Sequence, residues 1–482
     1  MHKQSMFTLF LAILCLPVFA NNITVGNSTL TNGSAADGYG YVTFDLSWDN
    51  SWRLSSAPSN WDAAWVFVKY RVGSGEWLPA NLHNTGHTAG TGTAADITVG
   101  LVDDNATFNA STNPGIGAFV YRSSTGTGTF TNTGLKLRWD YGADGIAGGT
   151  NVEVKVFAIE MVRVLEGTFN VGGGGGTDAF ISTTISTGDA TTAPSGTGSL
   201  GGEDGGYPTG QTAPNASWPN GYAAFYCMKY EVSQQQYVDF LNTLTQTQAT
   251  ERKANESSRC YAITGSAVGN YATTNPNVAC NFLSWADGAA YADWSGLRPM
   301  TELEFEKACR GPQTALAGEY AWGTATVATS AYTLSGAGTA NEGIATNYSI
   351  TVGNAVYNGT AGTILCPVRV GIFAADGLNS GRVSSGASYW GIMELSGNLY
   401  ERPVTIANEK GRAFTGKHGD GQLTSNGDAD AATWPGADAV GAGWRGGSWG
   451  NDANYMQVSD RLIAGFSYSV RYYDFGFRAV RR

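Results

Sequence analysis

The sequence has few charged side chains, few histidines and few cysteines. Charged residues make up 14% of its 482 positions, and 28 Lys and Arg face 39 Asp and Glu, for a formal charge of −11. Because nucleic acids and anionic membranes attract basic surfaces, this balance argues against both as partners. Hydrophobic residues reach 42% and glycines number 66, which is typical of a loop-rich, β-leaning protein of two or three domains that can still fill real cores.

Long apolar runs are also missing beyond the N-terminus. Lys3 precedes an apolar stretch from Met6 to Leu16, and residues 17–20 read Pro-Val-Phe-Ala, a small-residue cleavage pattern. This pattern predicts a secretory signal peptide over residues 1–20, too short to span a membrane. We therefore expect a secreted protein, extracellular or at the cell surface, without a membrane span.

Cysteine is scarce, with five residues after the predicted signal. An exported protein can oxidise its cysteines, so the sequence predicts two disulfides and one free thiol, with the pairing left open. The five are Cys227, Cys260, Cys280, Cys309 and Cys366.

Residues 21–160 show β patterning and no helical period. Strand-like runs separated by Gly, Ser, Thr and Asn clusters predict a β-sandwich domain. His83 and His87 in this part enclose Asn-Thr-Gly, a turn sequence, so a solvated loop is favoured over a metal site. The runs are residues 41–48, 65–72, 118–121, 135–139 and 152–157.

Residues 161–482 form the second predicted domain. A Gly-, Thr- and Ser-rich segment at residues 172–221 is expected to be a long loop. Three helices are predicted after it, because each has a readable cap: Ser233 with Gln236, Ser284 with Asp287, and Thr301 with Glu304. Regular periods vanish over residues 320–440, so disulfides, ions or indole packing must stabilise that part.

The stretch from Trp444 to Arg482 has two ordered ends. Residues 445–449 read Arg-Gly-Gly-Ser-Trp, where two glycines permit positive φ or close packing against an indole. Alternating apolar residues over 475–480 predict a closing strand. The middle is rich in Asn, Asp, Ser, Tyr, Gly and Ala, which suits an exposed irregular loop.

These ends and several upstream motifs resemble the formylglycine-generating enzyme family, also called sulfatase-modifying factors, over about residues 161–482. The resemblance implies a C-type-lectin-like α+β domain with little regular secondary structure, following the β-sandwich. The upstream motifs, in family order, are Met161-Val162 to Gly167-Thr168-Phe169, Tyr230-Glu231-Val232-Ser233, Trp285-Ala286-Asp287, Leu297-Arg298-Pro299-Met300-Thr301-Glu302 and Gly397-Asn398-Leu399-Tyr400-Glu401.

The family's catalytic members are expected to oxidise a cysteine in a substrate peptide with copper held by two cysteine thiolates of the C-terminal stretch. No cysteine follows Cys366 here, and the stretch offers Asn, Asp, Tyr and Met456 instead. Soft Cu(I) needs thiolates, which amides and a thioether do not replace. We therefore expect no copper and no catalytic residue. An oxidoreductase of the formylglycine-generating or sulfoxide-synthase type with altered metal chemistry is the alternative.

The resemblance also implies structural calcium. The family's calcium loop supplies a side-chain oxygen, two backbone carbonyls and a glutamate, which fall on Glu394, Gly397, Leu399 and Glu401. Calcium takes about six to eight oxygen ligands, which these groups and waters can provide. Asn341 is a weaker candidate for a second site, and a surface turn with two solvated acids is the alternative to the first.

The resemblance to the family, together with the missing cysteine pair, predicts a secreted, non-catalytic, lectin-like binding or structural module. We expect it to recognise a protein or glycan. Aromatic and amide side chains give rigid contact area and adaptable hydrogen bonds. The alternatives are rings that merely pack the loop, a receptor diversified by a retroelement, and a subunit of extracellular filaments that self-assembles through the sandwich. The predicted contact residues are Trp449, Asn451, Asn454, Tyr455, Tyr468, Tyr472 and Tyr473, with Phe466 beside them.

Overall fold

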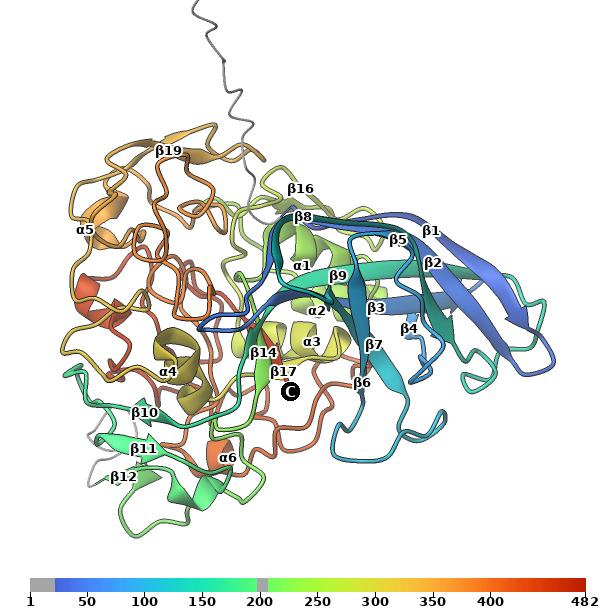
Figure 1. The fold of residues 1–482 in the computed structure, drawn as a ribbon, viewed down its shortest axis with the longest axis horizontal. Coiled ribbons are helices and arrows are strands. Elements are labelled where there is room, and N and C mark those ends of the chain that lie inside the picture. Colours follow the sequence, from blue (N-terminus) through green and yellow to red (C-terminus); the bar gives the residue numbers. More distant parts are fainter. Residues whose placement is uncertain (1–21, 197–206) are drawn as a thin grey trace, which may run out of the picture.

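A computed structural model describes residues 22–196 and 207–482 (Figure 1). The predicted signal peptide lies outside these residues, as does the middle of the Gly-rich segment. Strands of the first third of the chain gather on one side of the molecule, and the opposite side consists mainly of loops with a few short helices. Within the described part of the chain, no helix is both long and apolar enough to cross a membrane.

Two sheets organise the N-terminal part, as the alternating runs predict. The smaller sheet has the order β1-β2-β8-β5, and the larger has the order β17-β20-β14-β9-β3-β7-β6 with β4 paired to β3. The strands of the smaller sheet are β1 (Thr24–Ser34), β2 (Tyr39–Arg53), β8 (Gly126–Trp139) and β5 (Thr91–Gly92). Those of the larger are β17 (Arg298–Pro299), β20 (Ala479–Arg481), β14 (Phe225–Met228), β9 (Val152–Val164), β3 (Asp62–Val72), β7 (Gly115–Arg122), β6 (Ala95–Leu101) and β4 (Leu78–Pro79).

Strand β3 is buried on both faces, which explains its nearly continuous apolar sequence. Ala64, Val66 and Val68 face the smaller sheet and pack in the sandwich core. Trp65 and Phe67 face the other way, toward the helices, and belong to a second core. The sandwich is therefore covered on one outer face by the rest of the molecule.

Strand β9 connects the sandwich to the C-terminal part. Its residues 152–162 pair with the whole of β3, and Met161–Val164 pair with β14. Residue 160, where the sequence places the domain boundary, lies within this strand. The division into two domains stays a prediction, but one sheet runs through both.

The three predicted helices are present and begin at the predicted caps. They are α1 (Gln234–Leu241), α3 (Trp285–Trp294) and α4 (Glu302–Arg310), each with a reciprocal capping box. Helix α2 (Gln246–Arg252) carries the same box at Thr245 and was not predicted. The short elements are η1 (Ala190–Thr192), α5 (Asn358–Ala361), α6 (Glu409–Arg412), η2 (Ala453–Met456) and the two-stranded pairs β10 (Phe169–Val171) with β11 (Thr183–Ile185), β12 (Ser195–Gly196) with β13 (Tyr207–Pro208), β15 (Ile263–Thr264) with β16 (Ala272–Thr273), and β18 (Thr333–Ser335) with β19 (Gly343–Thr346).

The prediction of two disulfides is wrong. Cys260 and Cys366 form one disulfide that closes a sequence separation of 106 residues. Cys227, Cys280 and Cys309 are free and buried. Each of these three thiols packs as a small apolar group within a hydrophobic cluster.

Buried ion pairs, in addition to apolar packing, stabilise the C-terminal part. Arg445 lies 3.1 Å from Glu302 and 2.9 Å from Glu306, and Arg461 lies 2.7 Å from Glu302. Arg310 pairs with Glu306 at 3.2 Å. All five side chains are at most 1% exposed, so the network links α4 to the C-terminal stretch through the interior.

Candidate binding surface at the C-terminal stretch

Buried arginines fix both ends of the C-terminal stretch. Arg445 joins the network on α4, and Arg478 Nε donates to Glu401 at 2.7 Å while its other nitrogens donate to the carbonyls of Met228 and Met393. Gly447 between them has φ +67°, and a Cβ there would lie 2.9 Å from Met456 Cγ. The two ends are therefore held rigidly, and the glycine is required by both its φ and the close packing.

Four large apolar side chains stand out from the middle of the stretch. Phe466, Tyr468, Val470 and Tyr472 are 49%, 48%, 47% and 44% exposed. They occupy alternate positions in seven residues, and residues 466–470 are all exposed. We call these four residues the apolar stripe.

The stripe rests on a packed base. The ring of Trp444 lies 4.3 Å from that of Phe475 and 5.7 Å from that of Tyr468. The buried Arg402 guanidinium lies 5.3 Å from the Trp444 ring and donates to the Tyr468 carbonyl at 3.0 Å. Burial without a paired carboxylate lowers the pKa of Arg402 to about 9. Trp444 thus supports the Tyr468 ring from below, and the Tyr472 ring lies 5.5 Å from that of Phe475. A preformed contact surface requires such support.

Trp449, predicted as an exposed contact residue, is only 5% exposed, so that expectation is wrong. Its indole lies 5.3 Å from the Tyr473 ring and 5.6 Å from the Arg259 guanidinium. Arg259 precedes the disulfide at Cys260, which brings this distant segment over the indole. Trp449 therefore packs the surface from inside.

The other predicted contact residues lie either in or behind the stripe or in the segment around η2. Tyr468 and Tyr472 belong to the stripe, and Tyr473 is half-buried behind Tyr472 with ring centroids 4.2 Å apart. Asn454 is exposed and Tyr455 half-buried on η2. The half-buried Asn451 is tied into the loop through its carbonyl, which accepts the Asn358 N–H at 2.9 Å, and through its side chain, which accepts from Ser448.

The residues of the predicted calcium loop lie in the interior. Glu394 Oε1 accepts the Gly371 N–H at 2.8 Å, and its Oε2 is buried without a hydrogen-bond partner. Glu401 Oε2 is likewise buried and unpartnered. Burial raises the pKa of Glu394 to about 7 and also raises that of Glu401. Unsatisfied buried carboxylate oxygens fit a hard cation, so the donor set suits calcium.

Of the remaining calcium candidates, Gly397 and Leu399 belong to the same loop and Asn341 does not. Gly397 has φ +93°, and the Leu399 N–H donates to Glu231 Oε1 at 2.9 Å, which places a third buried carboxylate at the loop. Asn341 is exposed elsewhere, and the carboxylate of its neighbour Glu342 accepts the N–H groups of Gly338 and Arg369. Both Glu342 oxygens therefore have hydrogen-bond partners, in contrast to Glu394 and Glu401.

The model of the "Sulfatase-modifying factor enzyme 1-like domain" family matches residues 153–482, more than two thirds of the chain. The chain belongs to this family. A search of curated proteins finds no match. Among solved structures, "Treponema denticola variable protein 1" is similar at 16% identity and a TM-score of 0.34, over 68% of this chain and 96% of that chain.

The thiols of this sulfatase-modifying-factor-like domain are poorly placed for copper chemistry. Cys227 lies in β14, Cys309 in α4, and Cys280 just before α3. Burial raises the pKa of Cys227 to about 12 and raises those of the other two well above the usual thiol range. Since the thiolate is the copper ligand and nucleophile, burial disfavours both roles.

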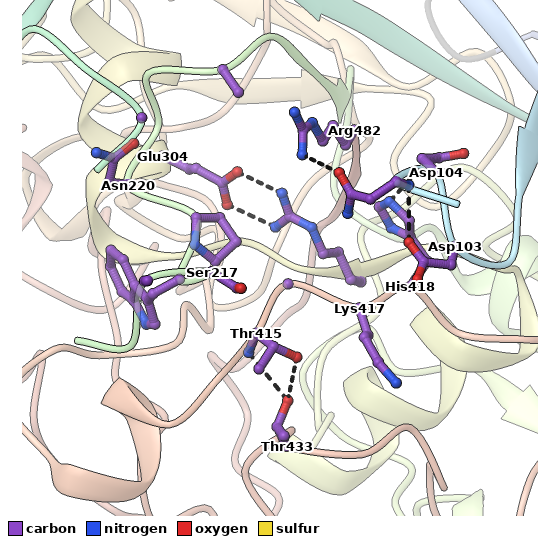
Figure 2. A pocket seen from close by; sticks show the side chains of 18 of the residues that line it. Asp103, Asp104, Ser217, Asn220, Glu304, Thr415, Lys417, His418, Thr433 and Arg482 are labelled. Atoms are coloured by element: carbon purple, nitrogen blue, oxygen red, sulfur yellow. Dashed lines mark hydrogen bonds and ion pairs between the residues drawn. The ribbon is translucent and has the colours of Figure 1, made fainter. Parts of the chain in front are cut away.

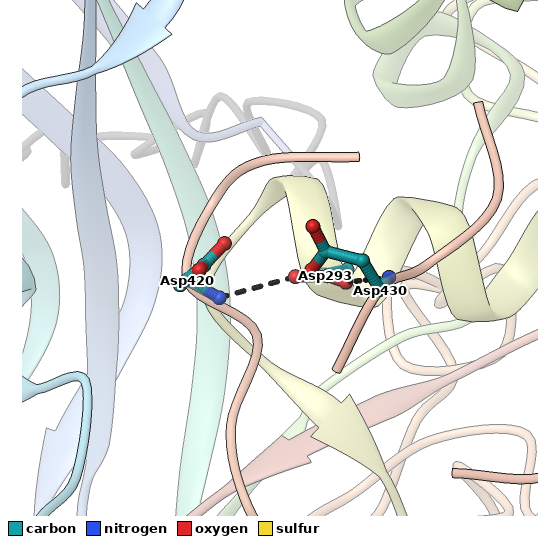
Figure 3. A group of neighbouring side chains, drawn as sticks. All are labelled: Asp293, Asp420 and Asp430. Atoms are coloured by element: carbon teal, nitrogen blue, oxygen red, sulfur yellow. Dashed lines mark hydrogen bonds between the residues drawn. The ribbon is translucent and has the colours of Figure 1, made fainter. Parts of the chain in front are cut away.

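One acidic group of the domain was not predicted: carboxylate oxygens of Asp293, Asp420 and Asp430 lie within 4.8 Å of one another (Figure 3). The buried Asp293 carboxylate accepts the N–H groups of Asp420 at 3.1 Å and Asp430 at 2.9 Å. Lys69 of β3 donates to the carbonyl of the neighbouring Gly421 at 2.6 Å. These contacts indicate that Asp293 organises the loop over residues 420–431. They give no independent sign of a bound ion.

Proposed function

We propose that this chain is a secreted, non-catalytic binding module whose contact surface is the apolar stripe. The observation that carries the proposal is the clustering of four exposed large apolar side chains within seven residues. Contiguous exposed apolar groups at one place on a surface mark interaction sites, whereas single ones do not. The other large exposed hydrophobic side chains of the described residues are scattered along the chain, from Leu30 to Leu378.

The side chains of the stripe favour a protein partner over a glycan. Phe466 and Val470 offer no hydrogen-bonding group, while Tyr468 and Tyr472 offer rigid rings with a polar tip, a mixture typical of the centre of protein interfaces. The candidate calcium ligands Glu394 and Glu401 are 7% and 0% exposed. An ion held there would be structural and would not contact sugar hydroxyls at the surface.

The test is a screen of the purified protein against extracellular proteins and a glycan array, followed by surface plasmon resonance. We expect a protein ligand whose Kd rises about tenfold or more in Tyr468→Ala/Tyr472→Ala, since aromatic side chains dominate interface energies. Ile350→Ala is the matched control, because Ile350 is 58% exposed outside the stripe. Binding that survives the double substitution, or binding to glycans alone, would overturn the proposal.

We also propose a structural calcium ion at Glu394, Gly397, Leu399 and Glu401. The support is the pair of buried, unpartnered carboxylate oxygens in the family's calcium loop. A ligand that binds only the folded state raises its melting temperature. We expect calcium to raise the Tm relative to EDTA in the wild type, and to have little effect in Glu394→Gln. Equal Tm values with calcium and EDTA in the wild type would refute the site.

Retroelement diversification is a second candidate for the stretch. Met456 and Gln457 are the residues that mutated Asn codons would not produce, and the structure has Met456 fully buried against Gly447. A scaffold residue would be left unchanged by diversification, so its burial is compatible with this idea. An adenine-rich near-copy of the coding segment beside a reverse transcriptase would support it.

The oxidoreductase alternative has weaker support because the free thiols are buried, which raises their pKa values. Oxygen uptake in the presence of copper and a cysteine-containing peptide tests it directly. We expect no turnover, and stoichiometric copper with turnover would replace the binding proposal.

A further inference from the structure

Buried carboxylates of this chain differ in how fully their oxygens are hydrogen-bonded. In a pocket of about 740 Å³, both oxygens of Glu304 accept hydrogen bonds from Arg298, at 2.8 and 2.6 Å (Figure 2). A second buried group lies where the sandwich meets the sulfatase-modifying-factor-like domain and consists of Asp62, Glu160 and Lys229. Here Glu160 Oε1 has no hydrogen-bond partner among the described residues. This incompletely satisfied group can do more than hold an ion pair.

Three neighbouring strands of the larger sheet bring the group together. Asp62 begins β3, Glu160 lies in β9, and Lys229 directly follows β14. Glu160 is opposite Ala64 of β3, and its carbonyl accepts the Lys229 N–H at 2.9 Å, so it lies between the other two. The side chains of Asp62, Glu160 and Lys229 are 0%, 3% and 2% exposed. The sheet therefore holds one amine and two carboxyl groups where water is excluded.

The amine of Lys229 lies beside both carboxyl groups. Its Nζ donates to Glu160 Oε2 at 2.9 Å and lies 3.6 Å from Asp62 Oδ2, next to the carboxyl carbon. The rings of Trp52 and Tyr230 lie 4.8 and 5.4 Å from Nζ. Groups that a fold holds in contact react as if they were present at very high concentration.

The two oxygens of Asp62 have different surroundings. Oδ1 accepts the Ser51 hydroxyl and the Trp52 N–H, each at 2.9 Å. Oδ2, which is the oxygen near Lys229, accepts Trp48 Nε1 at 2.9 Å. Two donors on one oxygen stabilise the negative charge that develops there when a nucleophile adds to the carboxyl carbon. Oδ1 is thus placed to hold that charge, and Oδ2 is placed to leave.

Glu160 is placed to carry protons between the other two groups. Burial raises the pKa of Glu160 and that of Asp62, and Lys229 opposes both shifts. Burial alone would lower the pKa of Lys229, but its neighbours, Glu160 foremost, raise it above the usual range. The amine is therefore freed when its proton moves along the hydrogen bond to Glu160. A reaction that takes place once per molecule needs this state only briefly.

We propose that Lys229 and Asp62 join in an intramolecular amide bond, with Glu160 as the residue that transfers the protons. Lys229 Nζ forms a bond to Asp62 Cγ, and the bond between Cγ and Oδ2 breaks. Of the three ammonium protons, one stays on the amide nitrogen and two leave with Oδ2 as water, so Glu160 ends as it began. The product replaces a buried ammonium and a buried carboxylate by a neutral amide, which removes the penalty for burying both charges.

The amide links the two parts of the chain covalently. Asp62 belongs to the sandwich and Lys229 to the family domain, whereas the disulfide between Cys260 and Cys366 lies within the family domain alone. The bond does not depend on the function proposed for the apolar stripe.

Peptide mapping of the full chain by mass spectrometry, after reduction and trypsin digestion, tests the proposal. Trypsin does not cleave after an acylated lysine. We therefore expect residues 54–69 joined to residues 164–252, with a mass lower than their sum by one water. Lys229→Arg, which keeps the positive charge, and Glu160→Gln are each expected to release residues 54–69 as a free peptide. Lys155→Arg, at an exposed position of β9, is the matched control and should keep the joined pair.

The wild-type digest decides the proposal even if a variant fails to fold. Free peptides 54–69 and 164–229 as the main products would overturn it. Loss of water that maps to other peptides would overturn it as well. A joined pair that persists in folded Glu160→Gln would remove the role assigned to Glu160, and circular dichroism establishes that the variant is folded.

Discussion

The sandwich and the C-terminal part of this protein fill their interiors differently. Between the two sheets, the core consists of aliphatic and aromatic side chains from β2, β3, β7 and β8, such as Phe44, Val66 and Leu137. Between α4 and the C-terminal stretch, the interior holds Glu302 at 0% exposure beside Arg445 and Arg461 at 1% each. Strand ladders satisfy the backbone of the first region, whereas the second has long irregular segments that specific charge pairs hold in place.

The two interiors are therefore expected to lose stability in different ways when a side chain is removed. An apolar core loses stability in proportion to the contacts removed, and its neighbours partly relax. A buried ion pair is costly when one partner is removed, because the remaining charge has no water and no counter-charge. Arg445 therefore has a structural role in this chain, through its ion pairs with Glu302 and Glu306.

The largest loss of stability is expected for Glu302→Ala. The substitution leaves Arg445 and Arg461 buried without the carboxylate that both contact, at a cost of about 4 kcal/mol in the free energy of unfolding. Urea denaturation measures it, with Glu409→Ala on the exposed side of α6 as the control. If both variants lose less than about 1 kcal/mol, charge pairing does not stabilise this interior.

A smaller loss, of about 3 kcal/mol, is expected for Leu137→Ala in the sandwich core. Leu137 is 0% exposed on β8, and its removal leaves a cavity between the sheets. Lys136→Ala, one position along the strand and facing solvent, is the matched control and should change the unfolding free energy little. A loss larger than that of Glu302→Ala would reverse the ranking of the two regions.

The smallest of these effects is a pH dependence at the base of the stripe. Burial raises the pKa of Asp474 to about 6, while a hydrogen bond from Ser448 opposes this. Since the folded state binds this proton more readily than the unfolded state, the stabilisation is complete below about pH 4 and is lost as pH rises through 6. Asp474→Asn should therefore gain roughly 2 to 3 kcal/mol relative to the wild type between pH 4 and pH 7.5. If the difference in unfolding free energy between Asp474→Asn and the wild type is the same at pH 4 and pH 7.5, this prediction is wrong.

Local signals were read correctly from the sequence. The capping boxes at Ser233 and Thr301 and the N-cap at Ser284 predict helix starts, and in the structure each side chain accepts the N–H of the residue three positions on. Thr245 and Gln248 form a capping box at the start of α2, so this helix could have been predicted in the same way. The alternating strand runs were equally local, and all five fall within strands of the structure.

Features that depend on distant residues were not predictable in the same way. The disulfide count failed because pairing depends on which of five cysteines the fold brings together, and three were used as apolar packing. Trp449 was expected to be exposed, but Arg259 covers it from nearly two hundred positions away. The stripe was found in part, through Phe466, Tyr468 and Tyr472. Val470 was missed because only its alternate spacing with them marks it.

Strand β9 also decides how the protein can be divided for experiments. Expressing residues 161–482 alone would remove the first nine residues of this strand together with its partner β3. The last four residues of β9 would then form an open sheet edge beside β14. Apolar side chains that pack against the removed strands, such as Trp294 on Phe67 and Tyr226 on Phe119, would meet water. Such an edge recruits strands from other molecules. A fragment that starts before residue 62 keeps the edge covered, so truncation should follow the sheet rather than the family boundary.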